Sequence, residues 1–244
     1  MRFCKYWAIG AIVITLLSAC SDFRQGNSPS STSKDFTLHA VSGSEHLTNR
    51  NIELITSVYG ISSQASTETG LYEIVPSETK GSNIIYTDFD SKTRTYLCNR
   101  PECEHCDDTC TSWLPYGAGG GALFATEDHL YYLSFGNRNP DVVEAIGKDA
   151  LPQLIQLARN GTEKEVMHTF GAADIIREGV VFDHDNIYFI CDSFENFEQN
   201  GNLPERILYQ YDITDRVLNK LEKLSPDDQI IGTSQREIFL STTE

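Results

Sequence analysis

The chain has 244 residues, with 35 acidic and 19 basic side chains and a formal net charge of -16 at pH 7. This acidity argues against nucleic-acid binding, which needs a basic surface, and against polybasic attraction to anionic lipid. Hydrophobic residues make up 40% of the chain. That is enough for a buried core, and the length suits one large all-β domain or two small domains.

The first twenty residues have the pattern of an export signal. Arg2 and Lys5 are basic, residues 6–17 form an apolar run, and small residues precede Cys20. The run has about a dozen residues, whereas a membrane-spanning helix needs about 20. The sequence therefore predicts a cleaved signal over residues 1–19 rather than a membrane span.

The motif Leu17-Ser18-Ala19-Cys20 resembles the lipobox of bacterial lipoproteins. This resemblance implies cleavage before Cys20, acylation of its thiol, and a lipid anchor on the extracytoplasmic face of the cell membrane. Several acyl chains hold a protein firmly, because each buried methylene contributes about 0.8 kcal/mol. The alternative is an ordinary cleaved signal followed by a cysteine that carries no lipid.

Residues 20–34 are polar and rich in serine, with little to bury. They predict a flexible tether between the anchor and a domain over residues 35–244. Cleavage removes the two positive charges of Arg2 and Lys5, so the mature chain carries -18. We therefore expect the lipid, and not the protein surface, to hold the chain at the membrane.

From Gly70 onward, short aromatic and β-branched runs alternate with polar turns, which is typical of antiparallel strands. Residues 36–66 are ambiguous, and residues 52–59 are expected to form a strand or an irregular packing segment. The expected strands cover residues 70–75, 83–88, 93–98, 122–125, 129–134, 153–157, 163–167, 179–182, 186–190, 206–211, 217–221, 229–231 and 237–240.

These strands fall into a repeat of two hairpins. Corresponding apolar residues of the first hairpin are Leu130, Ile187 and Ile238, at offsets of 57 and 51 residues. Four strands in roughly 40 to 55 residues predict β-propeller-like blades of antiparallel strands; the alternative is a β-sandwich. Only about three and a half blades fit between residues 70 and 244. We therefore expect an incomplete ring or part of a longer propeller.

Four cysteines, Cys98, Cys103, Cys106 and Cys110, fall within thirteen residues. Disulfides suit an exported protein, a structural zinc site suits thiolates beside an imidazole, and free or redox-active thiols are the third possibility. A metal site would use Cys98, Cys103, His105 and Cys110. Cys103 and His105 share one face of an extended segment, from which Cys106 points away.

The same stretch resembles a segment of uncharacterised propeller-like lipoproteins from Gram-positive gut anaerobes. The matching residues are Leu97, Cys98, Pro101, Cys103, His105 and Cys110. Cys106 is additional in this chain, which leaves the ligand set and any disulfide pairing open. The resemblance implies a location and a fold, but it implies no activity.

Other candidate sites have simpler explanations. Asp88 and Asp90, Asp183 and Asp185, and Asp212 and Asp215 occupy hairpin turns, where carboxylates bond to the backbone. Cys191 lies in an apolar run and is expected to pack in a strand.

The sequence contains neither a Gly-x-Ser-x-Gly nucleophile motif nor a phosphate-binding loop, so we assign no catalytic residue. The predicted anchor and the loops that propeller blades present on one face instead favour a lipid-anchored binding or scaffold module for an extracellular protein or glycan. The alternative is a glycan-directed hydrolase or lyase.

Overall fold

The computed structural model describes residues 36–42, 52–56, 60, 62–77, 81–115, 120–137, 139–234 and 237–243. The predicted signal, the predicted tether and Cys20 lie outside the described residues. Strands dominate the described ranges, which confirms the all-β class. Across these ranges, no helix has the length and apolar character that a membrane crossing requires.

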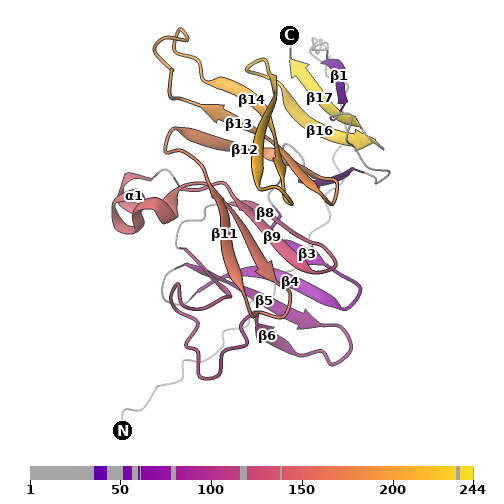
Figure 1. The fold of residues 1–244 in the computed structure, drawn as a ribbon, viewed down its shortest axis with the longest axis vertical. Helices are drawn as coiled ribbons and strands as arrows, with labels where there is room; N and C mark the ends of the chain where they lie inside the picture. The colour runs from indigo at the N-terminus through magenta and orange to yellow at the C-terminus, as the bar shows by residue number, and fades with distance from the viewer. Residues whose placement is uncertain are drawn as a thin grey trace, which may run out of the picture. The chain divides into compact units, whose positions relative to one another are not determined.

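Within the described ranges, antiparallel strands form four sheets, numbered in chain order (Figure 1). Sheet 1 contains β3 (Gln64–Ser66), β4 (Gly70–Pro76), β5 (Ser82–Asp88), β6 (Arg94–Tyr96) and β7 (Trp113–Leu114). Sheet 2 contains β8 (Gly121–Ala125), β9 (His129–Ser134), β10 (Gln153–Ala158) and β11 (Lys164–Thr169).

Sheet 3 contains β12 (Asp174–Phe182), β13 (Asn186–Ser193), β14 (Glu205–Asp212) and β15 (Val217–Lys223), with β2 (Glu53–Thr56) beside β12. Sheet 4 contains β16 (Gln229–Ser234), β17 (Glu237–Thr243) and β1 (Phe36–Ser42). Helix α1 (Pro140–Ile146) and the 3-10 helix η1 (Gly147–Ala150) lie between β9 and β10.

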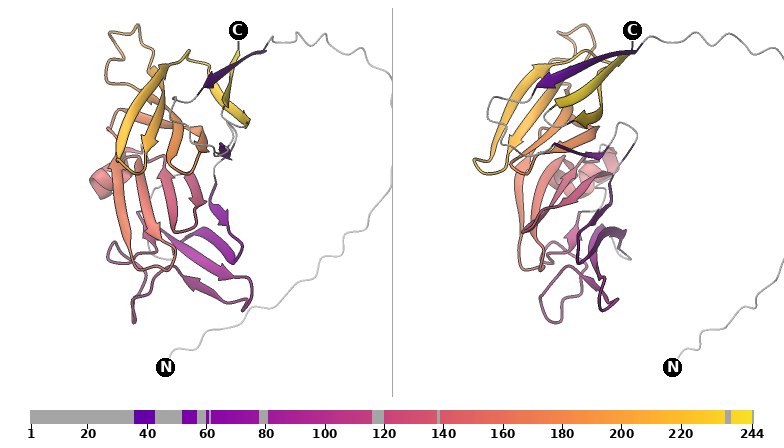
Figure 2. Two further views of the ribbon diagram at one scale, coloured as in Figure 1. Left: turned by 45° about the vertical axis from the view of Figure 1, so that its right-hand side comes forward. Right: turned by 90° about the vertical axis from the view of Figure 1, so that its right-hand side faces the viewer.

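Sheets 2 and 3 each contain four strands that pair antiparallel in chain order, as the blade repeat predicts. The sheets succeed one another in chain order from the magenta end of the domain to the yellow end (Figures 1 and 2). This arrangement confirms the prediction of propeller-like blades.

Within the described part of the chain, three apolar cores lie between successive sheets. Side chains alternate along a strand, so β9 contributes to two cores at once. Leu130 and Tyr132 pack against sheet 1, while Tyr131 and Leu133 pack against sheet 3. A strand that is buried on both faces needs a nearly continuous apolar run, which is why these strands stand out in the sequence.

The three residues that define the repeat occupy equivalent places. Leu130 lies in β9, Ile187 in β13 and Ile238 in β17, each on the second strand of its sheet's first hairpin. Their exposed fractions are 0%, 0% and 1%. All three side chains are therefore buried, as equivalent positions in packed blades should be.

The structure contains elements and pairings that the sequence pattern did not predict. The expected half blade consists of the hairpin that begins at residue 229, but β1 adds a third strand to it and pairs along β17 from Phe36 opposite Thr243 to Ser42 opposite Glu237. This pairing satisfies an edge whose backbone groups would otherwise lack partners. Helix α1 was also not expected, although Asn139 caps it through the N–H of Asp141.

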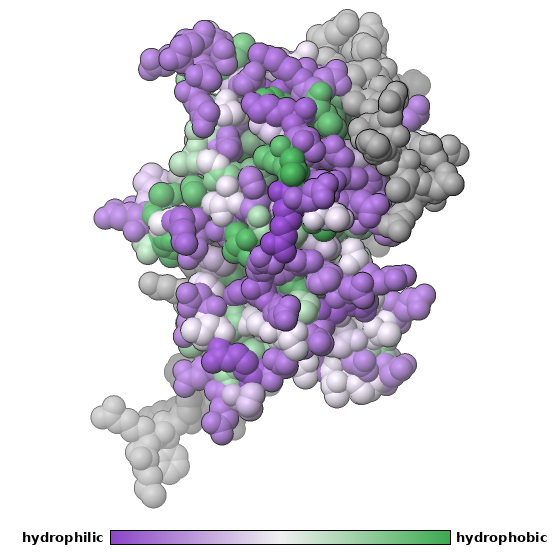
Figure 3. Space-filling model, in the orientation of Figure 1, coloured by the Kyte–Doolittle hydropathy of each residue, from purple (hydrophilic) through white to green (hydrophobic). Residues whose placement is uncertain are grey.

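The face shown in Figure 3 is largely hydrophilic, with apolar residues gathered in small separate areas. This agrees with a core that lies between the sheets.

The inter-sheet cores generate a stability prediction. Leu130→Ala should lower the free energy of unfolding by about 2–5 kcal/mol, because it leaves a cavity between sheets 1 and 2. Leu203→Ala is the matched control: Leu203 is 53% exposed, so its change should stay within about 0.5 kcal/mol. Equal effects in urea denaturation would contradict the packing described above.

Candidate metal centre

The cysteine-rich segment interrupts the outer strand of sheet 1. Strands β6 and β7 both pair antiparallel with β5, and only Ile84 of β5 lies between the two paired stretches. Leu97 donates its backbone N–H to the carbonyl of Ile84 at 2.9 Å, and Ile84 donates its N–H to the carbonyl of Ser112 at 2.8 Å. Residues 97–112, called the cysteine loop below, therefore begin and end beside the same residue of β5.

The cysteine loop is therefore an excursion within sheet 1 and not the connection between sheets 1 and 2. The two-residue strand β7 returns the chain to sheet 1 before it enters sheet 2. A strand of two residues has too little alternation to be recognised in a sequence.

Buried polar groups fix the base of the cysteine loop. The Asn83 side chain donates to the carbonyl of His105 at 3.1 Å and accepts from the Ser112 hydroxyl at 2.9 Å. Ser112 in turn lies 3.1 Å from the sulfur of Cys110. Asn83 and Ser112 are both buried, so this network holds two candidate ligand residues where water cannot compete with the bonds.

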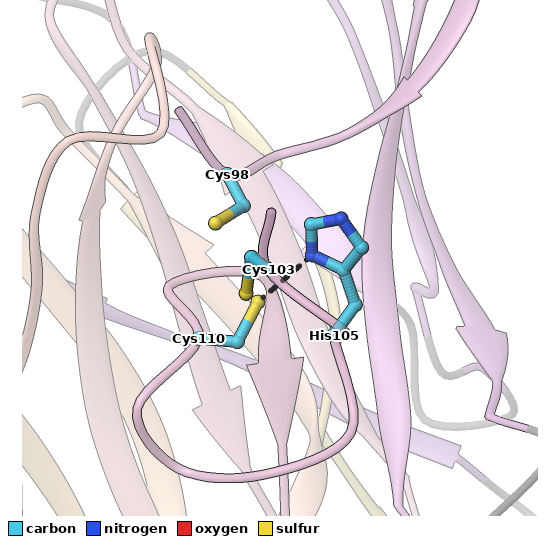
Figure 4. Close-up of side chains that lie close together, drawn as sticks. All are labelled: Cys98, Cys103, His105 and Cys110. Atoms are coloured by element: carbon cyan, nitrogen blue, oxygen red, sulfur yellow. Dashed lines mark hydrogen bonds between the residues drawn. The ribbon is translucent and has the colours of Figure 1, made fainter. Parts of the chain in front are cut away.

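The structure brings Cys98, Cys103, His105 and Cys110 together. One potential ligand atom from each residue lies within 4.8 Å of the others. The sulfur atoms and the imidazole point toward one another in Figure 4, and His105 Nδ1 lies 3.2 Å from Cys110 Sγ. Cys110 is buried and the other three are half-buried.

A second contact orients the imidazole. The ring of Tyr96 stacks on His105 with 4.0 Å between ring centroids and an angle of 17° between the planes. His105 itself has a positive φ of 56°, a conformation that is uncommon for residues other than glycine. The stacked Tyr96 ring therefore restrains the orientation of the imidazole.

All five cysteines of the described ranges are free thiols: Cys98, Cys103, Cys106, Cys110 and Cys191. Cys106 lies outside the cluster, with its sulfur 3.9 Å from Glu104 Oε2. It is half-buried, as Cys98 and Cys103 are, but it does not belong to the group of converging ligand atoms. Cys191 is buried in β13 within the core between sheets 2 and 3, as predicted.

The cluster places its thiols in unequal environments. Burial raises the pKa of Cys98, but hydrogen bonds, led by that of the Arg100 backbone, outweigh it and lower this pKa to about 7. Burial raises the pKa of Cys110 and lowers the pKa of His105. At neutral pH, His105 is therefore a neutral donor, and the thiol of Cys98 ionises before that of Cys110.

This donor set fits a tetrahedral metal ion. Three thiolates and one imidazole form one of the usual structural zinc sets, with bonds of about 2.3 Å to sulfur and 2.0–2.1 Å to nitrogen. Such bonds place neighbouring ligand atoms roughly 3.5–3.8 Å apart, so a small contraction of the cluster would close it around an ion. The Cys3His group can therefore hold a metal ion.

The turn carboxylates have structural roles, as predicted. Asp88 accepts hydrogen bonds from the N–H and the hydroxyl of Ser91, both at 2.7 Å. Buried Asp183 accepts from the N–H of Asn186 at 2.7 Å and from the hydroxyl of Tyr188 at 2.8 Å. These groups stabilise turns and lie outside the cysteine cluster.

Sequence reasoning did not locate the groove formed where the first hairpin turns of sheets 1, 2 and 3 meet. Its volume is about 930 Å³. Four acidic side chains line it: Glu53, Glu68, Glu127 and Asp128. Arg159 also lines it, but this guanidinium donates to the carbonyls of Thr126 and Glu127. The groove therefore has an acidic character, which only the folded arrangement of separate turns reveals.

No protein-family model and no curated protein matches the sequence. Among solved structures, an oligogalacturonate lyase in complex with manganese is similar, with a TM-score of 0.44 and 12% identity over 75% of this chain and 48% of that chain. An oligogalacturonate lyase from Vibrio parahaemolyticus gives a TM-score of 0.41 and 11% identity over 82% of this chain and 55% of that chain. TolB from Acinetobacter baumannii gives a TM-score of 0.35 and 16% identity over 72% of this chain and 38% of that chain.

The chain thus spans about half the length of the solved structures that it matches. At this level of similarity, the activities of those proteins do not transfer to it.

The thiol environments generate a prediction on reactivity. In the metal-free protein at pH 7, iodoacetamide should alkylate Cys98 roughly tenfold faster than Cys110, because the thiolate is the nucleophile. The rate at Cys98 should reach half its maximum near pH 7, where its pKa lies. Peptide mass spectrometry over time measures both rates. Faster modification of Cys110 would show that the described environment is wrong.

Proposed function

We propose that this protein is a membrane-tethered binding or scaffold module, and that a structural zinc ion organises its cysteine loop. The convergence of Cys98, Cys103, His105 and Cys110 carries the proposal, because four donor atoms lie within 4.8 Å at the base of a loop that departs from a single strand. Zinc held there would join the loop's two ends to its central residues.

Ligand chemistry favours zinc over the harder cations. Manganese, magnesium and calcium prefer oxygen ligands, whereas thiolates and imidazole suit zinc. Four protein ligands fill a tetrahedral shell, and a catalytic zinc site keeps one position open for water or substrate. The cluster therefore supports a structural role, not a hydrolytic one.

We propose that the module binds its ligand in the groove between the hairpin turns. Its volume of about 930 Å³ is in the range of sites that enclose small molecules or short segments. Its carboxylates would repel a polyanionic glycan, which disfavours a lyase acting on acidic polysaccharides. A glycan-directed hydrolase stays the second candidate, since the groove offers the acidic side chains that such a reaction uses.

For location, we propose acylation at Cys20 and display on the extracytoplasmic face of the membrane. The motif Leu17-Ser18-Ala19-Cys20 and the serine-rich residues that follow support this proposal. The domain is acidic, so an anchor is needed to keep it beside an anionic bilayer.

The zinc proposal predicts one zinc ion per chain in the protein purified without chelators. Cys103→Ser should weaken zinc binding by about 100-fold, because a quarter of a binding free energy of about 10–16 kcal/mol is roughly 3 kcal/mol. Cys106→Ser is the matched control and should keep wild-type affinity, since Cys106 lies outside the cluster. Elemental analysis and competition with a chromophoric chelator measure both quantities. Zinc lost equally in the two variants, or absent from the wild type, would refute the site.

The anchoring proposal predicts that Cys20→Ala abolishes incorporation of radiolabelled palmitate and moves the protein out of the membrane fraction, or leaves the signal uncleaved. Cys4→Ala serves as the control, because it lies in the part of the chain that cleavage removes. A wild-type protein that takes up no label and is recovered in the medium would count against acylation.

A further inference from the structure

A lysine of the neighbouring sheet contacts the backbone of the cysteine cluster. Lys164 begins β11, the outer strand of sheet 2. Its Nζ donates to the carbonyls of Cys110 and Trp113, both at 2.8 Å, and it lies 5.9 Å from the centre of the Trp113 ring. The side chain is half-buried, so its ammonium group is held against the end of the cysteine loop.

The turn between β10 and β11 contacts the same part of the loop. The Thr111 hydroxyl bridges the carbonyls of Gly161 and Leu97 at 2.8 and 3.0 Å, and Asn99 donates its N–H to Gly161 at 3.3 Å. Gly161 has a φ of +72°, and a Cβ there would lie 2.8 Å from the backbone nitrogen of Cys98. Sheet 2 therefore touches the loop on both sides of its base.

The charge of a filled site makes this contact chemically specific. A zinc ion with three thiolates and one neutral imidazole carries a net charge of -1. In a partly buried site, such a charge is costly unless a cation lies nearby. The positively charged ammonium group of Lys164 lies beside the carbonyl of Cys110, a ligand residue. Its hydrogen bond to this carbonyl also restrains the backbone of Cys110.

We propose that Lys164 is a positioning residue that sets the affinity of the zinc site, and that zinc binding is thereby coupled to the docking of sheet 1 on sheet 2. This inference rests on the proposed zinc site. If two events stabilise each other, the coupling is reciprocal: zinc tightens the contact between the sheets, and the contact tightens zinc binding.

The test uses the mature full chain with Lys164→Met, which keeps an unbranched side chain of nearly the same length and removes its charge. Competition with a chromophoric chelator should show zinc binding that is 10- to 100-fold weaker, the range found when groups that support metal ligands are removed. Lys164→Arg should recover most of the affinity. Lys220→Met, at an exposed position of β15, removes the same charge elsewhere and should bind zinc as the wild type does.

Cobalt substitution separates positioning from loss of a ligand. The cobalt-loaded Lys164→Met protein should keep the position of its sulfur-to-cobalt charge-transfer band, because the four ligands are unchanged. A purely structural role for Lys164 would lower the unfolding temperature equally with and without zinc. Coupling predicts a larger decrease for the zinc-loaded protein.

Hydrogen exchange on the wild type keeps the inference testable if the variant does not fold. Chelation of zinc should raise amide exchange in residues 158–164 of sheet 2 as well as in the cysteine loop, and leave residues 212–217 unchanged. Changes confined to residues 97–112, or equal zinc affinity in Lys164→Met and the wild type, would overturn the inference while leaving the zinc site intact. A wild-type chain that binds no zinc would instead refute the proposed function.

Discussion

The fold depends on the burial of both faces of its middle sheets. Sheets 2 and 3 have an apolar core on either side. The central residues of β9 (130–133) and of β13 (187–191) therefore are all apolar or aromatic, in spite of their alternating directions. This constraint fixes the order of the sheets and leaves their hairpin turns at the surface. The acidic groove forms where three of these turns meet.

The cysteine loop, in contrast, has no apolar core of its own. Between Cys98 and Ser112 it contains no large apolar side chain, so it cannot offset the conformational entropy of ordering by building a core. A metal ion bound by four residues contributes binding free energy directly to local folding. Ile84 joins both ends of the loop, buried Asn83 links His105 to Ser112, and Lys164 joins the loop to sheet 2. Contacts that belong to the sheets thereby hold the loop in an arrangement that can bind a metal ion.

Much of this architecture could be predicted from the sequence, because strands buried on both faces have strong local patterns. The repeat at Leu130, Ile187 and Ile238 located three equivalent strands. Local patterns do not reveal distant pairing, and β1 joins β17 from the other end of the domain. Helix α1 had a recognisable start in Asn139 followed by a proline, but it is short and contributes no buried residue to a core.

The cluster itself could be proposed from residue types, but its position could not. Thiols and an imidazole at short spacing indicate a metal site, whereas the spacing alone does not exclude Cys106 or choose between metal and disulfides. The return of the chain through β7 and the contact with Lys164 depend on residues separated by up to 54 positions. Such contacts form only once sheets 1 and 2 are packed together.

The most direct test of this account is X-ray absorption spectroscopy at the zinc edge of the mature protein in solution. The account predicts three sulfur atoms at about 2.3 Å and one nitrogen atom at about 2.0–2.1 Å from the ion. A shell of four sulfur atoms would place Cys106 in the site instead of His105, and a shell of oxygen atoms would show that the cluster does not bind zinc. Either result would contradict the central claim.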